Sequence, residues 1–473
     1  MSDKIHDECG VFAIFEPLST TVAKNTYIGL QALQHRGQQS CGIVVSDDGV
    51  FRQHKGLGLV NDVFNNKEIE KLDNANMALG HIRYTNNNLD NINNILPIVV
   101  RHIKGNLALG YNGKLTNSSE LRSHFELNGA IFYGNSDAEV IAYSIVLQRL
   151  QSRSIENAVE VAMYNLKGSY SCCLMSPSKL IAFRDPNGFK PLCLGITKNG
   201  GYVISSESCA IDTIGAKFIR DILPGEILVI SEEGLKSIKT HCQKKKTMCL
   251  FEFVNFARPD SVIEGISVHE ARLNAGRMLA KSNPVNADVV IGIPDSGLDA
   301  AIGYSIESKI PYEIGFIKNK YLNDSSIQQS NEESESTLQI KLNVIRSVIE
   351  NKRVVLIDDT LIKGTTVAKI IKLLKENGAK EVHVRISSPA LKYPCYFGTN
   401  IDADNLIASK YESIDDIKNQ IGADSLAYLS IDMVEKILPN ISLCKACFNG
   451  EYPIDIPENE EKDIYDKKIN NQN

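Results

Sequence analysis

The sequence predicts two domains of different fold class, an α+β unit in the first half and an α/β unit in the second. Its 473 residues can bury more than one core. The first half contains many short apolar or alternating runs bounded by Gly, Asn or Asp, with helical stretches between them. From residue 288 onward, continuous apolar strands alternate with helical stretches, which is typical of a parallel sheet. A polar, basic stretch at 237–248 separates the two patterns.

The composition, with 43% apolar and 23% charged residues, is that of an ordinary globular protein. A formal net charge of −6 gives no reason to expect nucleic acid as a partner. No apolar stretch approaches the roughly 20 residues that a membrane span requires. The N-terminal "MSDKIHDE" also lacks the apolar core of a signal peptide. We therefore expect a cytoplasmic enzyme.

Each element of the first half is bounded by turn residues. The expected strands are "CGVFAIF", "SCGIVVSDDG", "GNLALGYNG", "YSCCLM", "LIAFRDPNG" and "GYVISSES". Residues 137–150 are expected to form a helix. Sheets with covering helices account for this alternation.

The second half contains a strand–loop–helix–strand unit at 352–388. Its helix is indicated by apolar residues at helical spacing, namely Val367, Ile370, Ile371 and Leu374. Gly378 suits the C-terminal cap of that helix. Another strand, in "ADVVIGIPDSG", ends in a loop. The unit therefore predicts a parallel sheet.

Two loops at the ends of these strands indicate a phosphate site, because ligands of parallel sheets bind beyond the carboxyl ends of the strands. They are "IPDSG" (293–297) and "DDTLIKGTT" (358–366). Gly-Thr-Thr at 364–366 opens the predicted helix, whose first backbone N–H groups can hold a phosphate. Asp358 and Asp359 suit sugar hydroxyls or Mg²⁺ instead. The alternative is an acidic turn before a well-capped helix.

Cys9 heads an apolar strand and follows only eight, mostly polar residues. It is either a small core residue or the first residue of a processed chain. A thiol that opens the amide of glutamine needs a base, donors for the oxyanion, and charges that bind the α-carboxylate and α-ammonium. If the Glu8–Cys9 bond is cut, the new α-amine has a pKa of about 8 and can act as that base.

Polar clusters at the ends of apolar runs offer the remaining groups. Arg83 in "GHIRY" can pair with the carboxylate and Asp137 in "NSDAE" with the ammonium. Asn112 and Gly113 in "YNGKLTN" can form the oxyanion hole. Arg36 in "LQHRGQQSCGI" joins the glutamine-binding set. The alternative is that these are turn residues and that Cys9 is buried in a strand.

The ordered set of motifs resembles amidophosphoribosyltransferase, the glutamine-dependent first enzyme of purine synthesis. The similarity runs from about residue 6 to 453 and includes "RDPNGFKPL" (184–192), "SSESCA" (205–210), "FEFVNFARPDS" (251–261) and "CFNGEYP" (447–453). It implies an α+β N-terminal-nucleophile glutaminase sandwich followed by an α/β type I phosphoribosyltransferase domain. The implied divisions are a propeptide at 1–8, the glutaminase at 9–240, the phosphoribosyltransferase at 249–453 and a charged, disordered tail at 454–473.

The resemblance also implies a reaction with two sites. Removal of the propeptide makes Cys9 the mature N-terminus, and Cys9 then forms a γ-glutamyl thioester and releases ammonia. The ammonia crosses an internal channel to 5-phosphoribosyl-1-diphosphate (PRPP) and Mg²⁺, and yields 5-phosphoribosylamine, glutamate and pyrophosphate. The residues implied at the PRPP site are Asp295, Ser296, Lys318, Tyr321, Asp358, Asp359, Lys363, Gly364, Thr365 and Thr366, with Ser296, Asp358 and Asp359 near the Mg²⁺.

Four cysteines are candidates for a metal cofactor. Cys444 and Cys447 in "CKAC" suit one metal or cluster, but two more ligands are needed. Cys249 and Cys395 stand where the iron–sulfur subgroup of the family has its other two ligands. The resemblance therefore implies a [4Fe–4S] cluster. A zinc site with four cysteines and four buried thiols are the alternatives.

The chain departs from the family pattern in the mobile loop of the phosphoribosyltransferase half. Asp324 stands in place of an arginine, and Glu332, Glu333 and Glu335 follow it. We expect this acidic loop, 323–337, to weaken closure over a polyanion. In the glutamine pocket, "RYTNNN" replaces the usual R-Y-S-T-x-G and Tyr111 replaces a common histidine.

Two other functions fit parts of the pattern. A PRPP-sensing regulator would need no nucleophile at Cys9. A glutamine amidotransferase with another acceptor, such as a sugar phosphate, would not need the loop at 358–366. By analogy with the family we expect a homotetramer inhibited by purine nucleotides, with glutamine and PRPP as substrates.

Overall fold

The computed structural model describes residues 9–18, 20–84, 92–319, 342–399, 401 and 406–457. The described chain forms two compact units. We call residues 9–249, 396–399 and 452–457 the N-terminal unit, and the described residues from 250 to 395 and from 401 to 451 the C-terminal unit. The expected propeptide, Tyr321, the acidic loop at 323–337 and the tail from residue 458 lie outside the described residues.

Two antiparallel sheets form the centre of the N-terminal unit. The first sheet has the order β11-β9-β10-β1-β4-β2-β3, with β1 (Cys9–Phe15), β2 (Ser40–Asp47), β3 (Val50–Leu57), β4 (Met77–Arg83), β9 (Cys193–Ile196), β10 (Tyr202–Ser205) and β11 (Lys217–Asp221). The second sheet has the order β13-β12-β8-β7-β6-β5, with β5 (Ile98–His102), β6 (Gly105–Leu115), β7 (Gly168–Met175), β8 (Leu180–Arg184), β12 (Ile227–Ser231) and β13 (Gly234–Ile238). The strands expected in the first half are confirmed.

The side chains of β1 point alternately into two different cores of this unit, because successive side chains of a strand point to opposite faces. Val11, Ala13 and Phe15 pack in the core that the two sheets share. Phe12 and Ile14 pack on the other face, in the core that includes residues of α1 (Val22–Ala32). The outer face of the second sheet is covered by α5 (Asp137–Gln151) and α6 (Ile155–Ala162). The helix predicted at 137–150 is confirmed by α5.

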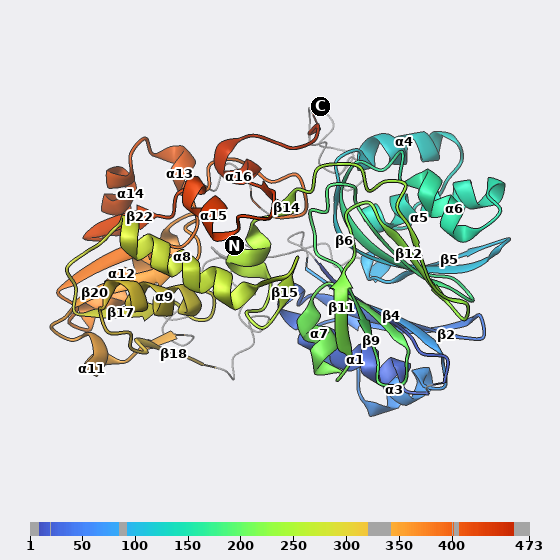
Figure 1. The fold of residues 1–473 in the computed structure, drawn as a ribbon, viewed down its shortest axis with the longest axis horizontal. Coiled ribbons are helices and arrows are strands. Elements are labelled where there is room, and N and C mark those ends of the chain that lie inside the picture. The colour runs from blue at the N-terminus through green and yellow to red at the C-terminus, as the bar shows by residue number, and fades with distance from the viewer. Residues whose placement is uncertain are drawn as a thin grey trace, which may run out of the picture. The chain divides into compact units, whose positions relative to one another are not determined.

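A parallel sheet of order β17-β20-β21-β22 forms the centre of the C-terminal unit. Its strands are β17 (Val289–Gly292), β20 (Arg353–Asp358), β21 (Glu381–Ile386) and β22 (Ser425–Tyr428). In Figure 1 these strands run side by side, with the helices α8 (Val268–Ser282), α9 (Leu298–Ser308), α12 (Thr365–Glu376) and α14 (Ile414–Ile421) around them. The strand–loop–helix–strand prediction is confirmed, and all four apolar residues predicted to face the core from α12 are buried.

Shorter elements complete the units. In the N-terminal unit they are η1 (Gln34–Arg36), α2 (Val60–Val63), α3 (Asn66–Leu72), η2 (Ile92–Asn94), α4 (Ser118–Leu127), α7 (Ser208–Thr213) and β14 (Met248–Cys249). In the C-terminal unit they are η3 (Glu252–Phe256), β15 (Val262–Ile263), β16 (Ile266–Ser267), β18 (Phe316–Lys318), β19 (Leu342–Val344), α11 (Arg346–Ile349), α13 (Ile407–Lys410), α15 (Ile431–Ile437), β23 (Leu443–Cys444) and α16 (Ala446–Asn449). Within the described ranges, no helix combines the length and the apolar character needed to cross a membrane.

Candidate active sites

Cys9 lies at the end of the core between the two sheets. It is the first residue of β1 and stands directly opposite Arg83 on β4. Paired residues of an antiparallel ladder project from the same face, and Cys9 shares the face of Val11, which packs between the sheets. The Cys9 side chain therefore points toward the second sheet, and the residue is only 5% exposed.

Asn112 and Gly113 lie in β6, on the facing sheet. Asn112 is buried and has the same strand parity as Ala108, which packs in the core between the sheets. Gly113 has a φ of +142°, and a Cβ there would lie 2.1 Å from the carbonyl oxygen of Ser169. Only glycine fits this position. The two residues predicted for the oxyanion hole thus stand on the sheet that Cys9 faces.

Arg83 is held by Asn94, a residue that sequence reasoning missed. Nη1 of Arg83 donates to the main-chain carbonyl of Asn94 over 2.6 Å. The Asn94 side chain is buried and bonds twice to Asn135: Nδ2 donates to Oδ1 at 2.6 Å, and Oδ1 accepts from the backbone N–H at 3.0 Å. Asn135 leads into Asp137 at the start of α5. Asn94 therefore connects the predicted carboxylate-binding and ammonium-binding residues.

Asp137 has a fixed carboxylate. Oδ2 accepts from the backbone N–H of Leu115 at 2.8 Å and from the hydroxyl of Tyr111 at 3.3 Å. Oδ1 accepts from the hydroxyl of Ser118 at 2.5 Å. Asp137 is also the first residue of α5, where the helix dipole favours negative charge. Tyr111, noted as a departure from the family, thus contributes a donor to this carboxylate.

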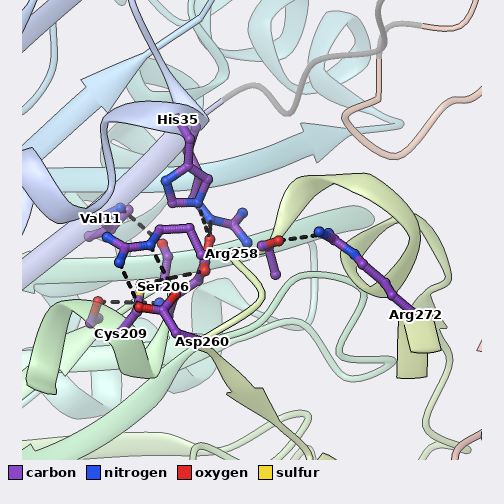
Figure 2. Close-up of polar contacts among 11 residues, drawn as sticks. Val11, His35, Ser206, Cys209, Arg258, Asp260 and Arg272 are labelled. Carbon is purple, nitrogen blue, oxygen red and sulfur yellow. Dashed lines mark hydrogen bonds and ion pairs between the residues drawn. The ribbon is translucent and has the colours of Figure 1, made fainter. Parts of the chain in front are cut away.

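Arg36 pairs with a buried carboxylate. Nε of Arg36 donates to Oε1 of Glu207, and His35 Nε2 lies 2.6 Å from the same oxygen. Cys209 Sγ lies 3.6 Å from the other oxygen. Figure 2 labels His35 and Cys209 and draws the dashed contact of the His35 ring. Both Arg36 and Glu207 are 1% exposed. Glu207 lies in the motif "SSESCA", but the spacing of that motif did not indicate that Glu207 pairs with Arg36.

The turn after Arg36 lies against Arg83. A Cβ on Gly37 would come within 2.7 Å of the Arg83 carbonyl carbon, and Gln39 N–H donates to the Arg83 carbonyl at 3.1 Å. The pair formed by Arg36 and Glu207 therefore holds a turn that supports the backbone of Arg83.

In the C-terminal unit, the two predicted loops meet at the carboxyl edge of the sheet. β17 and β20 pair in parallel, which places the loop 293–297 beside Asp358 and Asp359. Oδ1 of Asp359 accepts from the hydroxyl of Ser296 at 2.8 Å, and Oδ2 accepts from the hydroxyl of Thr360 at 3.2 Å. Nδ2 of Asn255 also donates to Oδ2. Asn255 is the second functional residue that sequence reasoning missed.

The predicted phosphate loop ends at a helix N-terminus. Gly364 caps α12 with a φ of +80°, and a Cβ there would lie 2.7 Å from Cδ1 of Ile407. Thr365 and Thr366 begin the helix, whose first N–H groups can hold an anion. Lys318 pairs with Asp295 of the other loop, with Nζ 2.8 Å from Oδ2.

Three of the four candidate cluster cysteines belong to the C-terminal unit. The carbonyl of Cys447 accepts from the N–H groups of Lys392 and Tyr393, shortly before Cys395, at 2.9 and 3.1 Å. Cys444 is the last residue of β23, and Cys447 lies three residues later in α16. Cys249 belongs to the N-terminal unit, as the last residue of the long segment that ends at 249.

Phe251, two residues after Cys249, stacks on Phe448 with ring centroids 5.5 Å apart. In the part of the chain that the structure describes, no group of three or more His, Cys, Asp or Glu side chains could hold a metal ion. The side chains as placed do not form a preassembled metal site.

Comparison with known proteins covers both units. Residues 89–213 match the family model described as a glutamine amidotransferase domain, and residues 268–390 match the one described as a phosphoribosyl transferase domain. The chain is 41% identical over 460 residues to the amidophosphoribosyltransferase of Bacillus subtilis, covering 96% of this chain and 95% of the relative. It is 42% identical over 463 residues to that of Methanocaldococcus jannaschii, covering 95% and 98%.

Solved structures give the same result. One, titled as the allosteric regulatory enzyme of purine biosynthesis, matches with a TM-score of 0.90 and 41% identity, covering 95% of this chain and 97% of the other. A second, the glutamine PRPP amidotransferase of B. subtilis complexed with ADP and GMP, matches with a TM-score of 0.89 and 41% identity, covering 95% and 98%. The predicted order of folds, a glutaminase followed by a phosphoribosyltransferase, is confirmed.

Proposed function

The chain belongs to the amidophosphoribosyltransferases, the glutamine PRPP amidotransferases of the first step of purine synthesis, and from this premise we propose how its residues divide the reaction. The N-terminal unit releases ammonia from glutamine, and the C-terminal unit transfers that ammonia to PRPP with loss of pyrophosphate. An internal channel keeps the ammonia from protonation and loss. The observation that carries the proposal is the position of Cys9, opposite Arg83 and facing the sheet of Asn112.

In the glutaminase reaction, Cys9 is the nucleophile. Cleavage before Cys9 exposes an α-amine that takes the thiol proton, and the thiolate attacks the side-chain amide of glutamine. The C–N bond of the amide then breaks, and the α-ammonium returns the proton to the departing ammonia. Asn112 and the N–H of Gly113 donate to the oxyanion. Arg83 binds the α-carboxylate and Asp137 the α-ammonium, while Arg36 acts on glutamine through the turn that supports Arg83. Water then cleaves the γ-glutamyl thioester and releases glutamate.

In the transferase reaction, the loop 364–366 binds the 5-phosphate and Asp358 and Asp359 bind the ribose hydroxyls. The parallel pairing of β17 and β20 supports this division, since it brings the loop 293–297 to the same edge. Asp295, Ser296, Lys318, Tyr321 and Lys363 complete the PRPP site. Mg²⁺, when bound, neutralises the departing pyrophosphate, and it needs only one or two protein carboxylates beside the substrate phosphates. Ser296, Asp358 and Asp359 are its proposed neighbours.

The four cysteines hold a [4Fe–4S] cluster in this proposal. The support is the resemblance to the iron–sulfur subgroup, together with the backbone contacts that bring Cys395 and Cys447 into neighbouring segments. Among the described residues, no group of three or more His, Cys, Asp or Glu side chains could hold a metal ion, and metal analysis tests the assignment. We give the cluster a structural role and route no step through it.

The proposed location, oligomeric state and ligands follow those of the family. We place the enzyme in the cytoplasm, as a homotetramer with glutamine and PRPP as substrates. The B. subtilis relative was solved with ADP and GMP, which supports purine nucleotides as inhibitors of this chain. No nucleic-acid or membrane partner is proposed.

The test is pyrophosphate release from PRPP with either glutamine or ammonia as the nitrogen source. The mature chain should begin at Cys9, as an intact-mass measurement can show. Cys9→Ala should abolish glutamine-dependent release and retain ammonia-dependent release. Equal loss of both activities would contradict the division into two sites. Glutamine hydrolysis without pyrophosphate release would indicate another acceptor, and neither activity in the mature wild type would favour a PRPP-sensing regulator.

A further inference from the structure

A short segment of the second half of the chain is part of the N-terminal unit. Residues 396–399 belong to that unit, although Cys395 and residue 401 belong to the other. Phe397 stacks on Phe189 with ring centroids 4.5 Å apart and an angle of 19° between the planes. Phe397 is 4% exposed and Phe189 is fully buried. Tyr452 contacts the edge of Phe397. The segment is therefore anchored in the core of the N-terminal unit.

Gly398 lies against the backbone of Gly113. A Cβ on Gly398 would lie 3.1 Å from the carbonyl carbon of Gly113, 3.2 Å from its Cα and 3.3 Å from the nitrogen of Lys114. On the β7 side, a Cβ on Gly113 would meet the carbonyl oxygen of Ser169 at 2.1 Å. The backbone at Gly113 is thus in close contact with two segments that are far apart in sequence.

A buried carboxylate completes the support of this region. Asp185 is fully buried and accepts from four backbone N–H groups, those of Tyr170, Asn187, Gly188 and Phe189, at 3.3, 2.9, 2.7 and 3.2 Å. Tyr170 is the β7 residue opposite Gly113, and Phe189 carries the ring that anchors Phe397. The contacts therefore form a closed path from Gly113 through Tyr170, Asp185, Phe189 and Phe397 to Gly398.

We propose that Gly398 is a positioning residue for the oxyanion-hole peptide at Gly113. The proposal rests on the proposed function, in which the N–H of Gly113 donates to the oxyanion. Such a donor must lie about 2.7–3.1 Å from the oxygen, so a displacement of a few tenths of an ångström weakens it. The wall of the glutaminase site is then completed by residues that follow the candidate cluster ligand Cys395.

The experiment compares Gly398→Ala with Gly234→Ala in the full-length, processed enzyme. Gly234, in the same unit, has a φ of +101°, close to the +96° of Gly398, but a Cβ there would meet nothing within 4 Å. The two positions have a similar positive φ, and only Gly398→Ala presses on Gly113. We expect kcat for glutamine hydrolysis to fall at least about tenfold in Gly398→Ala, since complete loss of one oxyanion donor costs about 10²–10³. KM for glutamine should stay within about twofold, because truncating an oxyanion donor acts on the transition state.

Two further readouts separate this effect from misfolding. Ammonia-dependent synthesis and the rate at which iodoacetamide alkylates Cys9 should match those of Gly234→Ala, because neither uses the oxyanion hole. If Gly398→Ala has the same glutamine kcat as Gly234→Ala, the proposal is wrong. If Gly398→Ala fails to fold, Phe397→Leu provides the test, and an unchanged glutamine kcat in that variant overturns the proposal. Absence of Cys9-dependent glutamine hydrolysis in the wild type would instead refute the proposed function.

Discussion

His81 donates from Nε2 to the carbonyl oxygen of Tyr111, 2.8 Å away, and this bond joins β4 to β6 across the core between the sheets. His81 lies two residues before Arg83, and Tyr111 lies one residue before Asn112. A carbonyl only accepts, so Nε2 carries the proton and Nδ1 is the bare nitrogen. Nδ1 is buried with no partner among the described residues. Burial lowers the pKa of His81 to about 3.

Stability should therefore depend on pH through His81. Between pH 6.5 and about 3, the unfolded histidine binds a proton that the folded one does not, so the free energy of unfolding falls as the pH falls. The slope from one such group is at most about 1.4 kcal/mol per pH unit. His81→Gln should flatten the slope in urea unfolding between about pH 7 and pH 5. His124→Gln, at an exposed position of α4, is the control, and an identical slope in wild type and His81→Gln would contradict the account.

Asn94→Ala should weaken glutamine binding. Without its side chain, the bonds to Asn135 are lost, and the distance between Arg83 and Asp137 is no longer fixed. We expect KM for glutamine to rise about tenfold, equivalent to about 1.4 kcal/mol, with a smaller change in kcat. Ammonia-dependent synthesis should not change. Asn94→Ala and Asn135→Ala should be strongly non-additive in a double-mutant cycle. Additive effects would show that the two side chains act separately. Asn128→Ala, at an exposed position, serves as the control.

Asn255→Ala should raise KM for PRPP in the ammonia-dependent assay. Asn255 donates to the Asp359 carboxylate, which also accepts from Ser296. Loss of one donor to a buried carboxylate costs about 1–3 kcal/mol, so the KM effect should be about five- to 150-fold. Asn255→Asp should be worse, because it places a second negative charge beside Asp359. Glutamine hydrolysis measured without PRPP should be the same in all three proteins. An unchanged KM in Asn255→Asp would remove Asn255 from the PRPP site.

Glu207→Gln should destabilise the N-terminal unit. The substitution keeps the shape but leaves the buried guanidinium of Arg36 without this carboxylate, a change that typically costs about 3–5 kcal/mol. The melting temperature should therefore fall, and KM for glutamine should rise because the turn beside Arg83 loosens. The double variant Arg36→Met with Glu207→Leu should recover much of the stability, since apolar replacements of buried ion pairs are often neutral. Failure of the double variant to exceed Glu207→Gln would indicate that another contact governs this region.

Anaerobically purified protein should be brown and contain about four irons and four sulfides per chain, as a cluster with four cysteine ligands requires. Cys447→Ser should remove the iron. Cys242→Ser is the matched control, because Cys242 lies outside the proposed ligand set. Zinc in place of iron and sulfide would support the zinc alternative, and absence of any metal would support four thiols.

The sequence predicted those helices and strands whose pattern of apolar residues lies within one continuous segment. The strand at Cys9–Phe15 is a continuous apolar run, and the helix at Thr365–Glu376 has its buried apolar residues at helical spacing. The stretch at Asp137–Gln151 is a long helical segment that begins after Ser136. The site residues found by sequence were those within named motifs. Asn255 lies within the named motif at 251–261 but was not singled out, and Asn94 lies in no named motif. Their partners are 104 and about 40 residues away, and no spacing encodes such contacts.

Arg36 has a partner that its polar cluster did not indicate. Its place in a polar cluster suggested substrate binding, but the structure pairs it with Glu207, 171 residues later in the chain. The segment 396–399 was likewise assigned to the second domain by its position in sequence, whereas its stacking on Phe189 makes it part of the first unit.

The place of Cys9 at the start of β1 separates activation from folding. All seven residues of β1, from Cys9 to Phe15, are in register with β4. Under the proposed cleavage, precursor and mature enzyme would share the β1 ladder and differ in the chemistry of the Cys9 nitrogen. Circular dichroism would not distinguish the two forms, whereas a mass spectrometer would. Preparations of equal purity and equal melting temperature can for this reason differ widely in glutamine-dependent activity, and the processed fraction is the quantity by which specific activity should be normalised.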